Sequence, residues 1–275
     1  MIFSAVIGAV VGFVVRKATP WLSGVKDDVG IRLPWPEAMG AALFAFAGPS
    51  PWALIFSGLL LAVLVTDFRY KLIPDKVSFP GTAIGIVASG IWPAFITGTF
   101  RQELLLKTIG LEAGVPGGMV LGVAGAAVGF GVFEGFRRLM SRLATMEVMG
   151  MGDSKLIMMM GAFLGPGGAL LCLFPGMICG LVIGVVYTRI MKSPHFPFGP
   201  ALALGGYITM LWPGIVGDGI GWMQDLARNA DRGALMVFNI LLLGVAVWLM
   251  LRVRKRSKEY TEAIERDYDK LEERD

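Results

Sequence analysis

Long runs of apolar residues constrain this chain more than any other feature of its sequence. A helix that is apolar on all sides belongs in lipid or in a large core, and about 20 such residues cross a bilayer. The sequence therefore predicts an all-α fold, a polytopic transmembrane bundle with about 8–9 membrane helices. We place its apolar spans at 2–15, 37–48, 52–66, 77–97, 117–134, 154–164, 168–191, 200–213 and 233–251.

The polar composition excludes several other classes of protein. Only 17% of the residues are charged, whereas soluble domains are about a quarter charged. Cys172 and Cys179 lie seven residues apart in one helical run, roughly 10 Å along its axis, which is too far for a disulfide. His195 is the single histidine, and no CxxC pair is present. We therefore predict no metal site, and the net charge of +4 fits basic loops rather than nucleic-acid binding.

The distribution of basic residues predicts the orientation in the membrane, because cytoplasmic loops are rich in Lys and Arg. No basic residue precedes the first apolar span, which we interpret as a retained helix with its N-terminus outside. The opposite side then receives most of the positive charge and is assigned to the cytoplasm. Its basic residues before the C-terminal tail are Arg16, Lys17, Lys26, Arg32, Arg69, Lys71, Lys76, Arg137, Arg138, Arg142, Lys155, Arg189 and Lys192.

The domain organisation follows from the same pattern. Residues 1–251 form one membrane-embedded domain, which includes a short cytoplasmic segment at 16–36 and an extra C-terminal span at 233–251. Residues 252–275 form a charged cytoplasmic tail that opens with a basic cluster.

Two acidic residues lie at the ends of apolar runs, where a charged side chain is energetically costly and is often functional. Asp67 ends the run at 59–66, and Asp153 opens the run that begins after Gly152. Under the predicted topology both lie at the cytoplasmic boundary, far apart in sequence but at one membrane depth. Each also has a structural interpretation: Asp153 as a helix N-cap, and Asp67 as an ion-pair partner of Arg69 or Lys71.

The surroundings of these aspartates resemble the type IV prepilin peptidases, a family of GxGD membrane aspartyl proteases. The matching stretches keep the family's order from about 37 to 211. They are DFRYKLIPD at 67–75, Glu147, GMGDSKL at 150–156, GAFLG at 161–165 and PFGPALALG at 197–205.

The resemblance implies that Asp67 and Asp153 are a catalytic dyad. Two adjacent carboxylates share a proton because both cannot ionise cheaply. One would act as general base on a water, and the other as general acid. Gly150, Gly152 and Lys155 would form the active-site loop, with glycines that let backbone approach the substrate. Candidate contacts for a basic substrate segment are Asp75, Glu134 and Glu147.

The family's substrates are prepilins and pseudopilins, which carry a basic leader before an apolar helix. The implied partners are these proteins, membrane lipids and the pilus or type II secretion machinery. Proteolysis by two aspartates needs no cofactor. N-methylation of the new N-terminus would use S-adenosylmethionine. Many bacterial members have a cysteine-rich segment after the first helix, and this chain has no cysteine at 16–36, so methylation stays open.

A transporter or channel that couples protons or cations through Asp67 and Asp153 is the alternative function. Such sites favour the bilayer midplane and repeated halves. Here both aspartates lie at a predicted boundary, and no internal repeat is recognisable. A non-catalytic assembly protein is a second alternative, which would have lost an aspartate or a loop glycine.

Overall fold

The computed structural model describes residues 2–24, 35–48, 50–92, 106–107, 110, 112, 114–144, 150–191, 198–216 and 218. The chain divides into two compact units. The first comprises Met1–Arg138 and Met149–Asp218, and the second comprises Leu139–Val148 and Gly219–Asp275. Of the second unit, only residues 139–144 are described, and they are helical. The predicted span at 233–251, the tail at 252–275 and the domain boundary between them lie outside the described residues.

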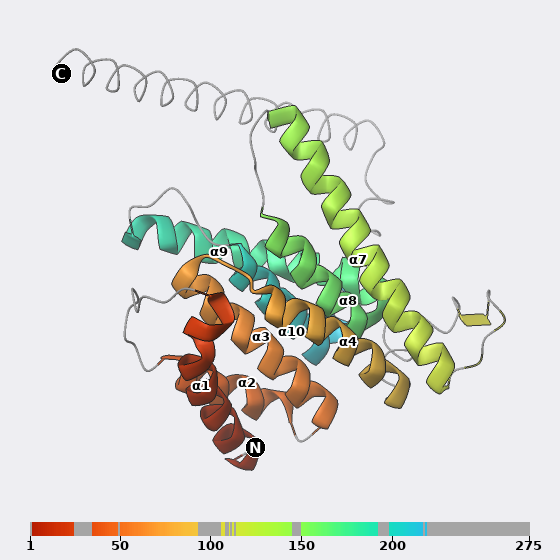
Figure 1. The fold of residues 1–275 in the computed structure, drawn as a ribbon, viewed down its shortest axis with the longest axis horizontal. Helices are drawn as coiled ribbons and strands as arrows, with labels where there is room; N and C mark the ends of the chain where they lie inside the picture. The colour runs from red at the N-terminus through yellow and green to blue at the C-terminus, as the bar shows by residue number, and fades with distance from the viewer. Residues whose placement is uncertain are drawn as a thin grey trace. The chain divides into compact units, whose positions relative to one another are not determined.

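Every regular element in the described ranges is helical (Figure 1). The elements are α1 (Ile2–Ser23), α2 (Trp35–Ala47), α3 (Pro51–Tyr70), α4 (Asp75–Ile91), α7 (Val115–Ala144), α8 (Met151–Leu171), α9 (Leu173–Met191) and α10 (Gly199–Leu211). Four of them, α1, α3, α7 and α8, are long and apolar enough to cross a membrane. This confirms the all-α architecture and its membrane character for the described residues. The count of 8–9 membrane helices stays a prediction.

The chain breaks where predicted between the spans at 154–164 and 168–191, and it breaks again further on. The helical geometry of α8 is interrupted at Gly165, with φ 72° and ψ 177°, inside the Gly-Pro-Gly-Gly run. A second break follows at Cys172, which forms a turn between Leu171 and α9. Pro166 then stands at the first position of the resumed helix, where its missing N–H leaves no hydrogen bond unmade.

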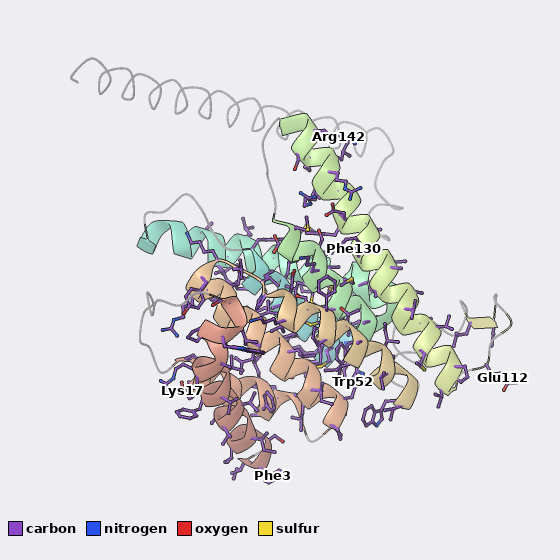
Figure 2. The ribbon with its side chains drawn as sticks, in the orientation of Figure 1. Phe3, Lys17, Trp52, Glu112, Phe130 and Arg142 are labelled. Atoms are coloured by element: carbon purple, nitrogen blue, oxygen red, sulfur yellow. The ribbon has the colours of Figure 1, made fainter. Side chains whose placement is uncertain are left out.

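Helix α3 lies at the centre of the first unit, in contact with α1, α2, α4 and α10. All of its residues from 60 to 67 are buried. Near its start, the ring of Trp52 packs 5.7 Å from those of Phe56 and Phe163, and Phe56 lies 4.8 Å from Phe163. Figure 2 shows Trp52 among the helices of this core. These aromatic contacts join α3 to α8.

Several pairs of the described helices meet through glycines, among them α4 and α7, where a β-carbon at Gly118 would overlap the Ser89 carbonyl oxygen. Gly8 of α1 contacts the backbone of Gly40 in α2, and Gly125 of α7 contacts that of Gly161 in α8; a β-carbon at any of these positions would overlap the facing carbonyl oxygen. In α9 and α10, a β-carbon at Gly205 would lie 2.5 Å from the backbone nitrogen of Gly176. Small residues at helix interfaces are typical of membrane proteins, where close packing replaces the hydrophobic driving force.

Candidate active site

Asp67 is held in the last turns of α3. Lys71 ends the helix in the left-handed conformation, with φ 51°, and its backbone N–H donates to the Asp67 carbonyl at 2.8 Å. The chain then passes through Ile73 and Pro74 into α4. Because the whole segment before it is buried, the Asp67 side chain is also enclosed and is only 5% exposed.

Asp153 lies in the first turn of α8 and does not cap it. The N-cap is Gly150, no side chain makes a cap hydrogen bond, and Met151 and Gly152 already belong to the helix. The N-cap interpretation of Asp153 is therefore wrong, because α8 begins earlier than the apolar pattern indicates. Asp153 is 9% exposed, and its carboxylate is not engaged in capping.

The fold places these two aspartates in one region of the helical bundle. The carboxylate of Asp153 lies close enough to that of Asp67 to experience its charge. One stands at the end of α3 and the other at the start of α8, so two elements distant in sequence contribute one acidic group each. Two buried carboxylates in electrostatic contact are costly unless they share a proton or serve a function.

The start of α10 packs against Asp67. The backbone N–H of Gly199 interacts with the Asp67 carboxylate. A β-carbon at Gly199 would lie 2.5 Å from Asp67 Oδ2 and 2.9 Å from Ile73 Cδ1. Oδ2 is buried and has no hydrogen-bond partner among the described residues. The site thus contains a carboxylate oxygen that can still accept a hydrogen bond.

Ile73 fills the space between two glycines of the site. Besides its contact with Gly199, its Cβ would lie 3.0 Å from a β-carbon added at Gly152. Ile73 lies in the DFRYKLIPD stretch and Gly199 in the PFGPALALG stretch, but neither was predicted to belong to the site. The signal was present in those motifs, but only the fold shows that they meet.

The other predicted site residues lie around the first turn of α8. Lys155 Nζ is 2.5 Å from Asp75 Oδ1 on α4 and lies over the Phe79 ring, 5.4 Å from its centroid. Gly150 has open space, with nothing nearer to an added β-carbon than the Gly152 nitrogen at 3.9 Å. The described residues contain no group of three or more His, Cys, Asp or Glu side chains able to hold a metal.

Two of the three candidate substrate contacts are already ion-paired. Asp75 is paired with Lys155, although its side chain is 58% exposed. Glu134 is buried and accepts hydrogen bonds from Arg137, Arg138 and Ser154. A substrate contact by Glu134 would require these bonds to break. Glu147 lies outside the described residues.

Comparison with known proteins finds a similar family. The model of the type IV leader peptidase family matches residues 54–185, a range that contains both aspartates and both loop glycines. Just under half of the chain is therefore similar to the type IV leader peptidase family. The family match ends before Gly199, so the contact between α10 and Asp67 is an observation of this structure.

Curated relatives of this leader peptidase family agree over a longer range. The chain is 29% identical over 203 residues to the prepilin leader peptidase/N-methyltransferase of Pseudomonas putida, covering 69% of this chain and 62% of the relative. It is 29% identical over 207 residues to the protein of that name from Dichelobacter nodosus, covering 73% and 64%. The chain therefore spans less than two thirds of the length of these relatives. No solved structure matches it significantly.

Proposed function

We propose that this protein is a membrane aspartyl endopeptidase that removes the basic leader from type IV prepilins or pseudopilins. The observation that carries the proposal is that Asp67 and Asp153 are both buried and lie within range of each other's charge. Similarity to the type IV leader peptidase family supports the same activity, because the matching relatives are named prepilin leader peptidases.

The dyad would work by general acid–base catalysis on a water molecule. The Gly199 N–H and the start of α10 face Asp67, and a helix N-terminus favours negative charge. We therefore assign the base to Asp67 and the acid to Asp153. Asp67 takes a proton from a water molecule, and the oxygen of that water attacks the scissile carbonyl carbon. Asp153 protonates the carbonyl oxygen. The tetrahedral intermediate then breaks its C–N bond. The proton held by Asp67 passes to the leaving nitrogen, and one hydroxyl of the intermediate returns its proton to Asp153 as the new carboxyl group forms.

The proposed site faces the cytoplasm, with the N-terminus of the chain outside. Lys76 Nζ donates to the Trp21 carbonyl at 2.8 Å, so the end of α1 lies beside the start of α4. The end of α3 and the start of α8 lie at this same end, together with Arg69, Lys71 and Lys155. This concentration of positive charge favours the cytoplasmic side. Asp75, partly exposed there, is the acidic group best placed to meet a basic leader.

Proteolysis by this dyad requires no cofactor. The relatives' names include N-methyltransferase, an activity that would use S-adenosylmethionine. We assign no described residues to that molecule, and the proposal contains no step through it. Mass analysis of the cleaved product decides whether this protein also methylates. The pilus or type II secretion machinery is the proposed setting.

Co-expression with a prepilin tests the proposal. Leader removal is followed by a gel shift for the wild type, Asp67→Asn and Asp153→Asn, each at matched membrane abundance. Asn keeps the shape of the side chain but cannot exchange the proton. We expect either substitution to abolish cleavage, because a dyad fails when one member is lost.

Two results would contradict the proposal. Cleavage at wild-type rates by both Asn variants would make the aspartates structural. Failure of the wild type on a panel of prepilins, combined with an Asp67- and Asp153-dependent proton flux in vesicles, would instead support the transporter.

A further inference from the structure

The first turn of α8 carries Asp153 but is not secured by its own cap. Its N-cap Gly150 has no side chain and makes no side-chain cap hydrogen bond, and the Asp153 N–H donates a long bond, at 3.3 Å, to the Gly150 carbonyl. The first N–H groups of a helix lack intrahelical partners, and helix ends fray. The position of the Asp153 carboxylate therefore depends on contacts that the same turn makes with other helices.

The two residues after Asp153 supply such contacts. Ser154 Oγ donates to Glu134 Oε2 on α7 at 3.2 Å, and Lys155 pairs with Asp75 on α4. Ser154 is fully buried, whereas Asp75 is largely exposed and its ion pair is weakened by water. The bond from Ser154 is therefore the firmer of the two constraints.

Glu134 is a fixed acceptor for this bond. Arg137 donates to both of its oxygens, from Nε to Oε2 and from Nη2 to Oε1, each at 2.7 Å. Arg138 Nε adds a bond to Oε1 at 2.8 Å. A bidentate guanidinium pair fixes the plane of the carboxylate as well as its place. Glu134 cannot turn without breaking these charged hydrogen bonds, so it holds Ser154 against α7.

We propose that Ser154 and Glu134 are positioning residues that fix the rotation of the first turn of α8 and so hold the Asp153 carboxylate in place relative to Asp67. Successive residues lie about 100° apart around a helix. Ser154 can therefore be tied to α7 while Asp153 faces α3. This inference rests on the proposed peptidase function and adds a role for residues that do not touch the reacting atoms.

Kinetics of Ser154→Ala test the inference in the full-length protein in membranes. Misplacing a catalytic group by about 1 Å can cost 100-fold in rate, so we expect kcat to fall about 10- to 100-fold with KM within about twofold. Ser57→Ala is the matched control, because Ser57 is equally buried but its hydroxyl bonds only Ala53 of its own helix, at 2.7 Å. The double variant Ser154→Ala/Glu134→Gln should be no slower than the slower single variant, since both changes break one link.

Cross-linking provides a readout that needs no activity. In a background with Cys172 and Cys179 replaced by alanine, Asp67→Cys/Asp153→Cys is treated with a short bifunctional thiol reagent. We expect Ser154→Ala to slow cross-linking several-fold and Ser57→Ala to leave it unchanged. Unchanged cross-linking together with wild-type kcat in Ser154→Ala would overturn the inference. If the wild type cleaves no prepilin, the proposed function fails, and cross-linking alone decides whether Ser154 positions Asp153.

Discussion

At Gly199 the start of α10 comes within the width of a methyl group of the Asp67 carboxylate. Glycine is required there by this close approach, since two separate atoms, Asp67 Oδ2 and Ile73 Cδ1, would meet an added β-carbon. Both are held firmly: Asp67 lies in a fully buried stretch of α3, and Ile73 is wedged against Gly152.

We predict that Gly199→Ala lowers the cleavage rate at least about 10-fold, because the extra methyl displaces Asp67 from Asp153. Overpacking of this kind costs about 1–3 kcal/mol in stability, so thermal unfolding should show only a modest decrease in Tm. Initial rates on a purified prepilin measure the first effect, and unfolding in detergent measures the second.

Gly135→Ala is the control for this substitution. Gly135 also lies in a helix, but nothing stands within 4 Å of an added β-carbon there. The Gly135→Ala enzyme should therefore cleave the prepilin at the wild-type rate. A Gly199→Ala enzyme that cleaves as fast as Gly135→Ala would show that the contact between α10 and Asp67 does not govern catalysis.

Among the helices, hydropathy located each described span but not always its end. The span expected at 2–15 belongs to a helix that continues to Ser23, and the one at 117–134 to a helix that continues to Ala144. Charged residues end the apolar pattern in both, but backbone hydrogen bonds do not require apolar side chains. Hydropathy thus reports where a helix leaves an apolar environment, and the helix itself continues.

The candidate site was predicted from sequence in part. Motifs indicated Asp67, Asp153 and the loop glycines, because these residue types are unusual at the end of an apolar run. The contacts of Ser154 with Glu134 and of Gly199 with Asp67 join segments distant in sequence. No local pattern indicates which distant residues meet, so this half of the site required the fold.

The ion pair between α4 and α8 gives a prediction at the same scale. Lys155→Ala should lower the free energy of unfolding by less than about 1 kcal/mol, because Asp75 is mostly exposed. Lys155→Asp should slow cleavage more, since two negative charges would then push the starts of α4 and α8 apart. The reversed pair Asp75→Lys/Lys155→Asp should recover most of the lost rate.

Cleavage assays and unfolding of the three variants check this prediction. If the cleavage rate recovers in the reversed pair, the ion pair between the two helices is what matters, and a lysine at position 155 is not specifically required. If the reversed pair is no faster than Lys155→Asp alone, Lys155 acts in some way other than by pairing with Asp75.

For the whole molecule, the membrane orientation is testable with one helix. Ser50 precedes α3 and Lys71 follows it, both exposed. With Cys172 and Cys179 replaced, Ser50→Cys should react with an impermeant maleimide added to intact cells. Lys71→Cys should react only after the membrane is opened. The reverse pattern would place the aspartates outside and exclude a cytoplasmic leader as their substrate.

The glycine contacts bear on how a substrate could enter. In the pairs α1–α2, α4–α7, α7–α8 and α9–α10, the facing backbones approach so closely that the interface glycines leave no room for a β-carbon. Helices joined by these contacts should therefore move together as a rigid body. We expect the apolar helix of a prepilin to enter between two such rigid bodies rather than between two helices that are joined by glycine contacts. The entry path to the aspartates would then open when these rigid bodies tilt apart, while the glycine contacts within each of them are preserved.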